Sequence, residues 1–560
     1  MTSLRLRGVA ALMVVACAFG CKKEGSGDRA ELPADLTPHP ASGDPSKLVV
    51  PALFANVPAD TPYLFASLDA IPPEFYAKLK QAFGPLFELA FRQGRALGDD
   101  NPLLAAILGE LDGKWNQAGL EALGFSAEPR FALYGLGLSP VVLRLAVKDD
   151  KALRATIERI AARAGASLPP MATKDGRSYW KIDIPDGPAL VIALAESQLI
   201  AAIGSPAKLD AKLGLILGTE KPAQTMADGK LVKELMARHG FGGQLIGVAD
   251  TRQIASQALE AAGAKSGAVC TAEVDRLSTK LPRVAMGYGE LSASKTSGGM
   301  VVELSPDAIA DLKALRVEIP GLAQLLSGTP LVAMGGGVDL ARAQQVAIAI
   351  AANLRKLGAA CELGPLADGA DRMSRTLSAP LPEPAGRIAG GAIAVEDVKF
   401  SGGRRREPIP DNVEGVALIA SPDARALFDK AVELAPSLKA LGVAADGKLH
   451  DLPQGTVPVP FPLAAGVGDK LIVLTAGTQQ KPRVEKLIGA HGGGKAPLFA
   501  MSYDSGKVFD LELQMFRELG AADPAMMGVF HTMRRVFGRV SGTLDVTDQG
   551  LVFWGTLELR

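Results

Sequence analysis

The sequence predicts an α+β fold built twice, with two similar halves in tandem whose mainly antiparallel sheets carry helices on one face. Apolar strands follow one another through short turns, which favours antiparallel pairing. Strand–aspartate–helix units recur along the chain, and their parts return in the same order at a nearly constant offset. The length of 560 residues also exceeds what one hydrophobic core usually supports. These observations together predict a tandem duplication.

The N-terminus predicts a lipoprotein signal peptide over residues 1–20. Two arginines precede an apolar run, residues 8–18, which is shorter than the roughly 20 residues that cross a bilayer. Gly20 and Cys21 then match the end of the lipobox, the motif at which bacterial lipoproteins are cut and lipidated on the cysteine. The two residues before Gly20 depart from the usual pattern. A plain secretory signal cut near Gly20 and an uncleaved anchor therefore stay open.

Lipidation of Cys21, for example with palmitate, would hold the protein at a membrane of the cell envelope. In enteric bacteria an aspartate directly after the lipidated cysteine retains lipoproteins in the inner membrane. Lys22 stands at this position, so by analogy we expect the outer membrane, with the protein facing the periplasm. Residues 21–58 are rich in Pro, Gly, Ser and charge without periodicity, which predicts a flexible linker.

Five apolar strands each end at an aspartate that precedes an amphipathic segment. These aspartates are Asp69, Asp250, Asp339, Asp423 and Asp504. A carboxylate at this place accepts bonds from the first free N–H groups of a helix and complements the positive end of its dipole. The five could instead form a metal or acid–base cluster, but they belong to different units and capping accounts for each one. We therefore expect helix caps.

The same parts recur in two halves of the chain. The halves are residues 59–318 and 327–560. Asp339 follows Asp69 by 270 residues, and Asp504 follows Asp250 by 254. A helix and a closing hairpin come after the later aspartate of each half. We therefore expect Asp69 to superimpose on Asp339, and Asp250 on Asp504.

Short strands and one clear helix are expected in the middle of the first half. The strands are residues 131–138, 141–148, 178–184, 189–196 and 198–203. The helix follows Lys148, with Asp150 as its cap, Leu153 and Ile157 on its inner stripe, and Gly165 at its end. The short turns between these strands predict antiparallel neighbours.

The cysteine count predicts one disulfide. Cys17 leaves with the signal peptide and Cys21 takes the lipid, so Cys270 and Cys361 are the remaining thiols. Two thiols in an oxidising compartment are expected to pair. Two unpaired buried cysteines are the alternative.

The segment VPADTPY, at Val57 to Tyr63, opens the first half, and GLVFWGTLEL, at residues 550–559, belongs to the closing hairpin of the second half. With the strand–aspartate–helix units, they resemble uncharacterised envelope lipoproteins of myxobacteria and related bacteria. The resemblance implies an envelope location and an α+β fold. It implies no activity and no catalytic residues.

The sequence contains no local motif that is typical of a catalytic site, a metal site or a nucleotide-binding site. Basic and acidic residues number 60 each, so no positive field favours a nucleic-acid partner. Residues 489–495 fit G-x4-G-K, but Ala496 replaces the required Ser or Thr and a helix precedes the glycines, so we expect no nucleotide. The five histidines show no metal spacing, and no H-E-x-x-H or G-x-S-x-G motif occurs. The sequence thus predicts no catalytic, metal or cofactor-binding residue and no cofactor.

These observations favour a lipid-anchored protein of the cell envelope that is not an enzyme and acts as a binding or structural module. Its expected partners are the membrane, through the N-terminal lipid, and an envelope protein or lipid. A periplasmic lipid or lipoprotein carrier with an apolar groove is the first alternative, and a hydrolase without a local motif is the second. A continuous apolar surface would favour the carrier. Convergent serine, histidine and carboxylate side chains would favour the hydrolase.

Overall fold

The computed structural model describes most of the chain from Pro45 onward. The described ranges are residues 45–96, 102–114, 116–126, 128–184, 187–264, 267–400, 410–455, 457–489, 494–518 and 524–560. The predicted signal peptide, Cys21 and the linker up to residue 44 lie outside them. The chain divides into two compact units, His39–Glu303 and Leu304–Arg560. We call them the first unit and the second unit and describe each by itself.

The first unit contains one antiparallel sheet. Its strands are β1 (Tyr63–Ser67), β2 (Phe131–Gly135), β3 (Val141–Ala146), β4 (Ala172–Lys174), β5 (Arg177–Asp183), β6 (Ala189–Ala195), β7 (Gln198–Gly204), β8 (Ile246–Asp250), β9 (Arg283–Leu291) and β10 (Lys295–Glu303). Neighbouring strands pair in the order β4-β5-β6-β7-β3-β2-β1-β8-β9-β10. The five strands expected in the middle of the first half are confirmed as β2, β3, β5, β6 and β7.

Helices of the first unit connect these strands and cover part of the sheet. They are α2 (Pro73–Ala96), α3 (Pro102–Leu111), α4 (Gln117–Ala122), α5 (Asp150–Arg163), α6 (Pro206–Leu217), α7 (Lys230–His239), α8 (Thr251–Ala261) and α9 (Ala268–Lys280). The predicted helix after Lys148 is α5, but its cap lies one residue earlier than expected. Asp149 accepts bonds from the N–H groups of Lys151 and Ala152, because Asp150 is already helical.

The second unit also contains an antiparallel sheet. Its strands are β11 (Val332–Gly337), β12 (Gly390–Lys399), β13 (Asn412–Ala420), β14 (Leu449–Asp451), β15 (Leu463–Val467), β16 (Leu471–Ala476), β17 (Phe499–Asp504), β18 (Phe537–Thr547) and β19 (Gly550–Leu559). They pair in the order β14-β15-β16-β13-β12-β11-β17-β18-β19. The expectation of an α+β fold with antiparallel pairing is therefore confirmed.

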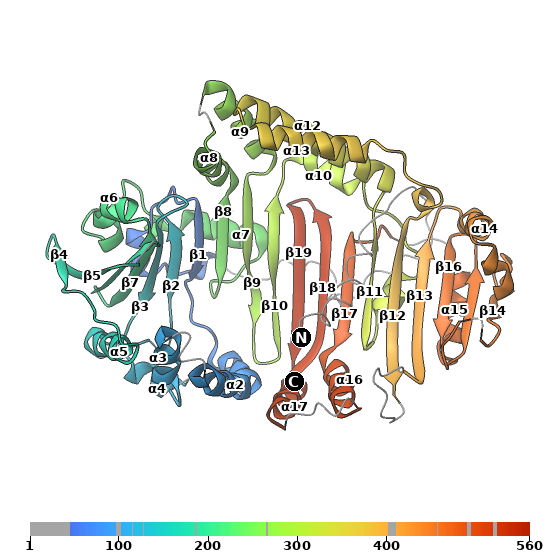
Figure 1. Ribbon diagram of the computed structural model, residues 1–560, viewed down its shortest axis with the longest axis horizontal. Helices are drawn as coiled ribbons and strands as arrows, with labels where there is room; N and C mark the ends of the chain where they lie inside the picture. Colours follow the sequence, from blue (N-terminus) through green and yellow to red (C-terminus); the bar gives the residue numbers. More distant parts are fainter. Residues whose placement is uncertain are drawn as a thin grey trace. The chain divides into compact units, whose positions relative to one another are not determined.

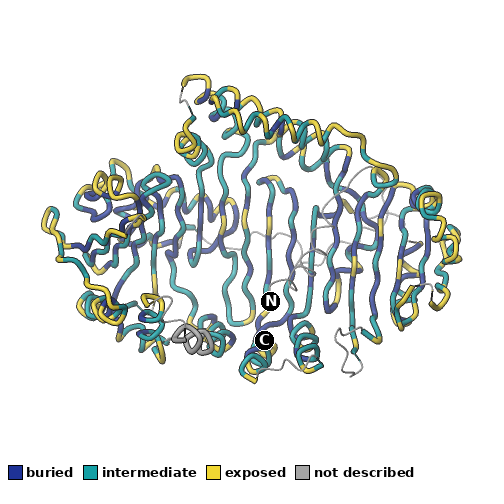
Figure 2. Tube along the Cα trace, in the orientation of Figure 1, coloured by how far each residue is buried: buried dark blue, intermediate teal, exposed yellow. Residues whose placement is uncertain are grey.

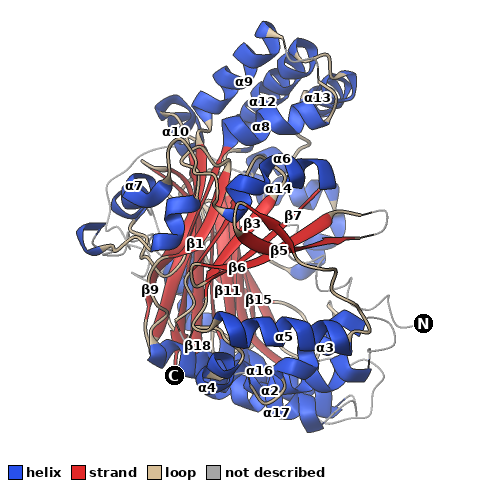
Figure 3. Cartoon of the chain, turned by 90° about the vertical axis from the view of Figure 1, so that its left-hand side faces the viewer, coloured by secondary structure: helices blue, strands red, loops and turns tan. Residues whose placement is uncertain are grey.

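Two helix pairs flank the strands of the second unit. Its helices are α10 (Pro306–Lys313), α11 (Leu322–Leu326), α12 (Leu340–Ala360), α13 (Gly364–Leu377), α14 (Ala424–Leu434), α15 (Lys481–Ile488), α16 (Ser505–Glu518) and α17 (Pro524–Val536). Helices α12 and α13 lie side by side at one end of the strands, and α16 and α17 lie at the other end (Figures 1 and 3).

The core of the second unit lies on one face of its sheet. Leu322, Leu325 and Leu326 of α11 and Val484 and Leu487 of α15 pack there against buried strand residues. In the first unit, α6 packs on β6 and β7, and its residues Leu209, Ile216 and Leu217 are buried. Each sheet therefore has one face that helices cover.

Capping is confirmed for four of the five aspartates. Asp250, Asp339, Asp423 and Asp504 each accept a bond from the backbone N–H three residues later. For Asp69 the prediction is wrong. Helix α2 begins four residues later, at Pro73, and no described backbone N–H donates to the Asp69 carboxylate. The intervening Ile71-Pro72 segment delays the helix, because a residue before proline avoids the helical region.

Two predicted boundaries need correction. The linker assigned to residues 21–58 already packs in its described part, where Phe54 and Val57 are fully buried and residues 52–56 form a short 3-10 helix. The cause is the apolar content of this stretch, which lacks helical periodicity but still has surface to bury. The first half was expected to run to residue 318, but residues 304–318 pack in the second unit. There Arg316 pairs with Asp545 at 3.1 Å.

The predicted disulfide between Cys270 and Cys361 is present, and both residues are buried. It closes a loop of 91 residues along the sequence. On the chain-entropy account, a loop of this length adds roughly 4 kcal/mol to the free energy of unfolding.

We therefore expect Cys270→Ala to lower the melting temperature, and the oxidised, denatured wild type to show no free thiol at these two positions. Thiol labelling with and without reductant, followed by mass spectrometry, measures the second quantity. Two reactive thiols before reduction would contradict the assignment.

Candidate functional site

A continuous row of apolar residues crosses the sheet of the first unit. Strand pairing places its members directly opposite one another from β6 to β10. They are Ile192, Ala201, Leu143, Leu133, Phe65, Gly247, Met286 and Met300. We call these eight residues the first row. Because opposed residues of antiparallel strands share a face, all eight side-chain positions lie on the same side of the sheet.

The sheet of the second unit carries a corresponding row from β15 to β19. Its members are also paired strand to strand. They are Ala465, Leu474, Ala417, Ile393, Met334, Met501, Gly542 and Gly555. We call these eight residues the second row. Neither row contains a side chain with a polar atom other than the methionine sulfur.

The rows lie on the less covered face of each sheet. Along the strands, burial alternates (Figure 2). The neighbours of Ile393 are buried, with Ala392 8% and Ala394 0% exposed, whereas Ile393 itself is 42% exposed. Met286 is 39% and Leu474 41% exposed. We call this side of each sheet the open face.

Row members also contact one another across glycine. A Cβ atom built on Gly247 would lie 2.7 Å from Cγ of Met286 and 3.1 Å from Cδ2 of Phe65. These two side chains therefore close over the glycine from both sides. Phe65 further packs against Phe131, with ring centroids 5.9 Å apart. The apolar surface is thus continuous from strand to strand rather than a set of isolated exposed residues.

Such a surface has a thermodynamic cost in water. Leaving apolar area exposed forgoes about 25 cal/mol for each Å² that could be buried. Single exposed apolar residues are ordinary, but contiguous ones mark interaction sites. The open faces are therefore the candidate binding surfaces of the protein.

Each row ends beside a residue with polar character. In the first unit, the strand neighbour of Ile192 is Trp180, and the guanidinium of Arg154 from α5 lies 5.2 Å from its ring centroid. In the second unit, the neighbour of Ala465 is His450, whose Nε2 lies 2.9 Å from Oδ1 of Asp446. The apolar surface thus stops at the β5 and β14 side of each sheet.

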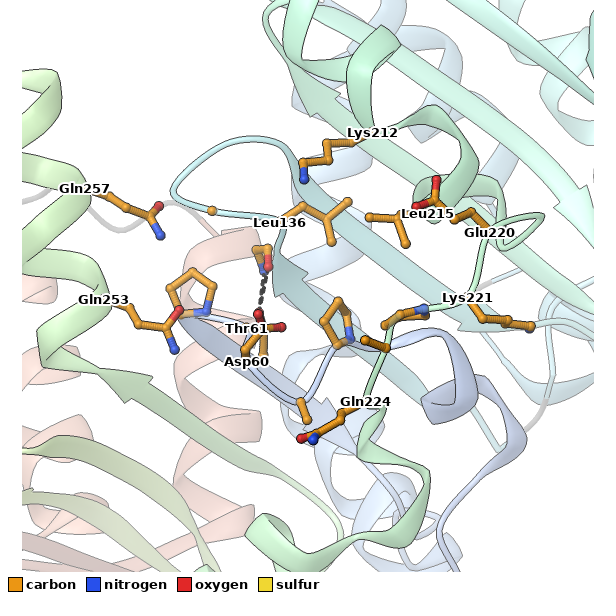
Figure 4. Close-up of a pocket in the computed structure, with 17 residues that line it drawn as sticks. Asp60, Thr61, Leu136, Lys212, Leu215, Glu220, Lys221, Gln224, Gln253 and Gln257 are labelled. Carbon is orange, nitrogen blue, oxygen red and sulfur yellow. Dashed lines mark hydrogen bonds between the residues drawn. The ribbon is translucent and has the colours of Figure 1, made fainter.

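A cavity of about 610 Å³ lies in the first unit (Figure 4). The segment from Pro58 to Pro62, part of VPADTPY, lines one wall, and Gln253 and Gln257 project from α8 on another. Lys212 and Glu220 lie on the remaining sides. The lining is therefore mixed in polarity and contains no histidine, cysteine or serine.

The polar groups of this cavity are partly engaged in holding its walls. Oγ1 of Thr61 donates to the carbonyl of Gly135 at 2.7 Å and accepts from the N–H of the same residue at 3.2 Å. Oε1 of Gln257 accepts the N–H of Leu138 at 2.5 Å. The single hydroxyl in the lining is thus tied to the backbone, and the carboxylates of Asp60 and Glu220 also line the cavity. This mixed lining suits binding of a polar molecule.

A buried ionic cluster lies elsewhere in the first unit, around Glu303. Nε2 of His239 lies 2.8 Å from Oε1 of Glu303, and Nε of Arg283 donates to Oε2 at 3.0 Å. Burial raises the pKa of Glu303, but the hydrogen bonds from His239 and Arg283 outweigh this effect and hold it below its usual range. The His239 and Glu303 side chains are 0% and 1% exposed, so the cluster is closed to substrate.

No described cluster of three or more histidine, cysteine or acidic residues could hold a metal ion. The lipidation residue Cys21 lies outside the described residues, so its role stays a prediction.

The two rows and the cavity were not predicted from the sequence. A signal for the rows was present, since segments such as Ala189–Ala195 and the first four residues of Leu471–Ala476 are apolar on both faces rather than alternating. Comparisons add no family: the chain matches no protein-family model, no curated protein and no solved structure. Within the described ranges, no helix combines the length and the apolar character that a membrane span requires.

Glu303→Gln tests the ionic cluster. At pH 7 it should lower the free energy of unfolding by about 3 kcal/mol, because Arg283 loses a buried counter-charge. In the folded state the pKa of Glu303 lies below the ordinary carboxyl value of about 4.3. The stabilisation by the ionised Glu303 carboxylate is therefore fully present above pH 4.3 and is lost as the pH falls through the folded-state pKa.

Urea unfolding between pH 7 and pH 3 would measure the difference, with Glu558→Gln on the surface as control. A difference that stays constant over this range would contradict the assigned role.

Proposed function

We propose that the protein is a lipid-anchored, non-enzymatic binding protein of the cell envelope, which binds an apolar partner through the open faces of its sheets. The observation that carries the proposal is the pair of apolar rows. The sixteen aligned positions carry no hydrogen-bonding side chain, so their contact with water is unfavourable in free energy. This cost is removed when another apolar surface binds over them. The carrier alternative draws on the same observation and specifies the partner.

The envelope location rests on the sequence of the N-terminus and on the disulfide. The lipobox-like Gly20-Cys21 supports anchoring, and a disulfide between Cys270 and Cys361 suits an oxidising compartment. Because Lys22 and not an aspartate follows Cys21, the proposed location of the protein is the outer membrane, facing the periplasm. The resemblance to envelope lipoproteins supports the same location.

We also infer that the two units arose by tandem duplication. Strands β5-β6-β7-β3-β2-β1-β8-β9-β10 correspond in order to β14-β15-β16-β13-β12-β11-β17-β18-β19. The connections agree as well, since a helix pair follows both β8 and β17. Asp250 and Asp504 hold the same place, as the last residue of these strands and the cap of the next helix. On this inference the two rows are counterparts.

Charged substitutions in the rows test the binding function. We expect Met286→Glu and Ile393→Glu each to remove about half of the fluorescence enhancement of a hydrophobic dye, and the double variant to remove most of it, since distant sites add. Both positions are partly exposed, so the fold should be retained.

The matched controls are Leu103→Glu and Leu434→Glu, which place the same charge at exposed apolar positions on α3 and α14. Equal loss in the controls, or no loss in the double variant, would count against binding through the open faces.

Cys21→Ser tests the anchor. The variant should lose N-terminal acyl mass and move from the membrane fraction to the soluble periplasmic fraction, because several acyl chains hold a protein firmly and none remain. Mass spectrometry of the N-terminal peptide and cell fractionation measure both effects. A wild type without acyl mass, or a variant that stays in the membrane, would refute the lipoprotein assignment.

A further inference from the structure

We propose that each row holds one acyl chain of a phospholipid, so that the protein binds two phospholipids, one on each unit. This inference rests on the function proposed above and specifies the occupant. Four observations lead to it: the chemistry of the rows, the residue types that they lack, their length, and the charge at the end of the first row.

The chemistry of the rows calls for a hydrocarbon. A polar group pressed against them would lose its hydrogen bonds to water without finding a partner, which costs several kcal/mol. The sixteen positions offer alkyl groups, methionine thioethers, one phenyl ring and three glycines. Methionine, present four times, is flexible and polarisable and adapts to a ligand of irregular shape.

The residue types expected of a protein-binding surface are absent from the rows. Protein interfaces are enriched in tyrosine, tryptophan and arginine and carry about one hydrogen bond for each 100–200 Å². Neither row contains any of these three residues. The two rows thus lack the residue types that supply most of the specificity and binding energy of a typical protein interface.

The length of each row fits a fatty chain. Eight strands at a spacing of about 4.8 Å give a row of about 34 Å. One leaflet of a bilayer occupies half of a hydrocarbon core about 30 Å thick, so a single acyl chain spans about 15 Å. Each row is therefore about twice as long as one acyl chain, and a chain that lies across the strands is covered along its whole length.

The end of the first row supplies a positive charge for a phosphate. Arg154 lies over Trp180, and its Nη1 donates to Sδ of Met171 at 2.8 Å. Within the described residues, no carboxylate lies within ion-pair distance of Arg154. An arginine without an acidic partner beside an apolar surface is complementary to an anionic headgroup attached to an acyl chain.

Native mass spectrometry of the full chain with added phosphatidylglycerol tests the proposal. The wild type should retain up to two lipids, Met286→Glu and Ile393→Glu one each, and the double variant none. Leu103→Glu and Leu434→Glu should retain two. Any covalent lipid at Cys21 adds a fixed mass to every species and does not affect the count.

The headgroup contact has its own test. Arg154→Gln should weaken phosphatidylglycerol binding about tenfold at one of the two sites, which corresponds to about 1.4 kcal/mol. It should leave binding of uncharged diacylglycerol unchanged, because the alkyl contacts remain. Circular dichroism melting of every variant establishes that the fold is retained.

The outcomes separate this proposal from the broader one. If the row variants abolish dye binding but the wild type retains no phospholipid, the open faces bind another partner, such as a second copy or an acylated protein, and the phospholipid assignment is wrong. If one substitution removes both lipids, the two-site arrangement is wrong. If the double variant still binds two lipids, neither row is the site.

Discussion

One constraint underlies the architecture of both units: an antiparallel sheet satisfies its backbone hydrogen bonds by itself, but leaves two faces to be covered. In the second unit, α11 and α15 cover one face and bury residues such as Val416 and Val473. The alternation of side chains then sends every second residue to the other face. The identity of those residues is not required for the core. Their uniformly apolar character therefore points to a role other than folding.

Local signals made much of the fold predictable. Short turns and apolar runs identified the strands β2, β3, β5, β6 and β7, and the capping chemistry of Asp250, Asp339, Asp423 and Asp504 marked where helices begin. The failure at Asp69 has the same origin, since capping depends on a helix that starts at once and Pro72 delays it. The cysteine pair was predictable from count and compartment alone.

The binding surfaces were harder to predict because they depend on register between distant strands. Phe65, Leu133 and Met286 are far apart in the sequence and become neighbours only when β1, β2, β8 and β9 pair. The cavity beside Thr61 likewise combines segments around residues 60, 136, 212 and 257. Packing of the described linker residues, including Phe54, was missed because proline and glycine around them obscured their apolar content. Non-local pairing was thus the missing information.

The strands β4 and β14, at one edge of each sheet, are only three residues long. A sheet edge is where another chain can add by backbone hydrogen bonding, and a short edge strand offers few unpaired N–H and C=O groups to such an addition. This matters for a protein with apolar faces, because an apolar surface next to a long free edge favours fibrillar growth. The shortness of β4 and β14 lets each unit keep a face that attracts apolar molecules while limiting strand-by-strand polymerisation at that edge.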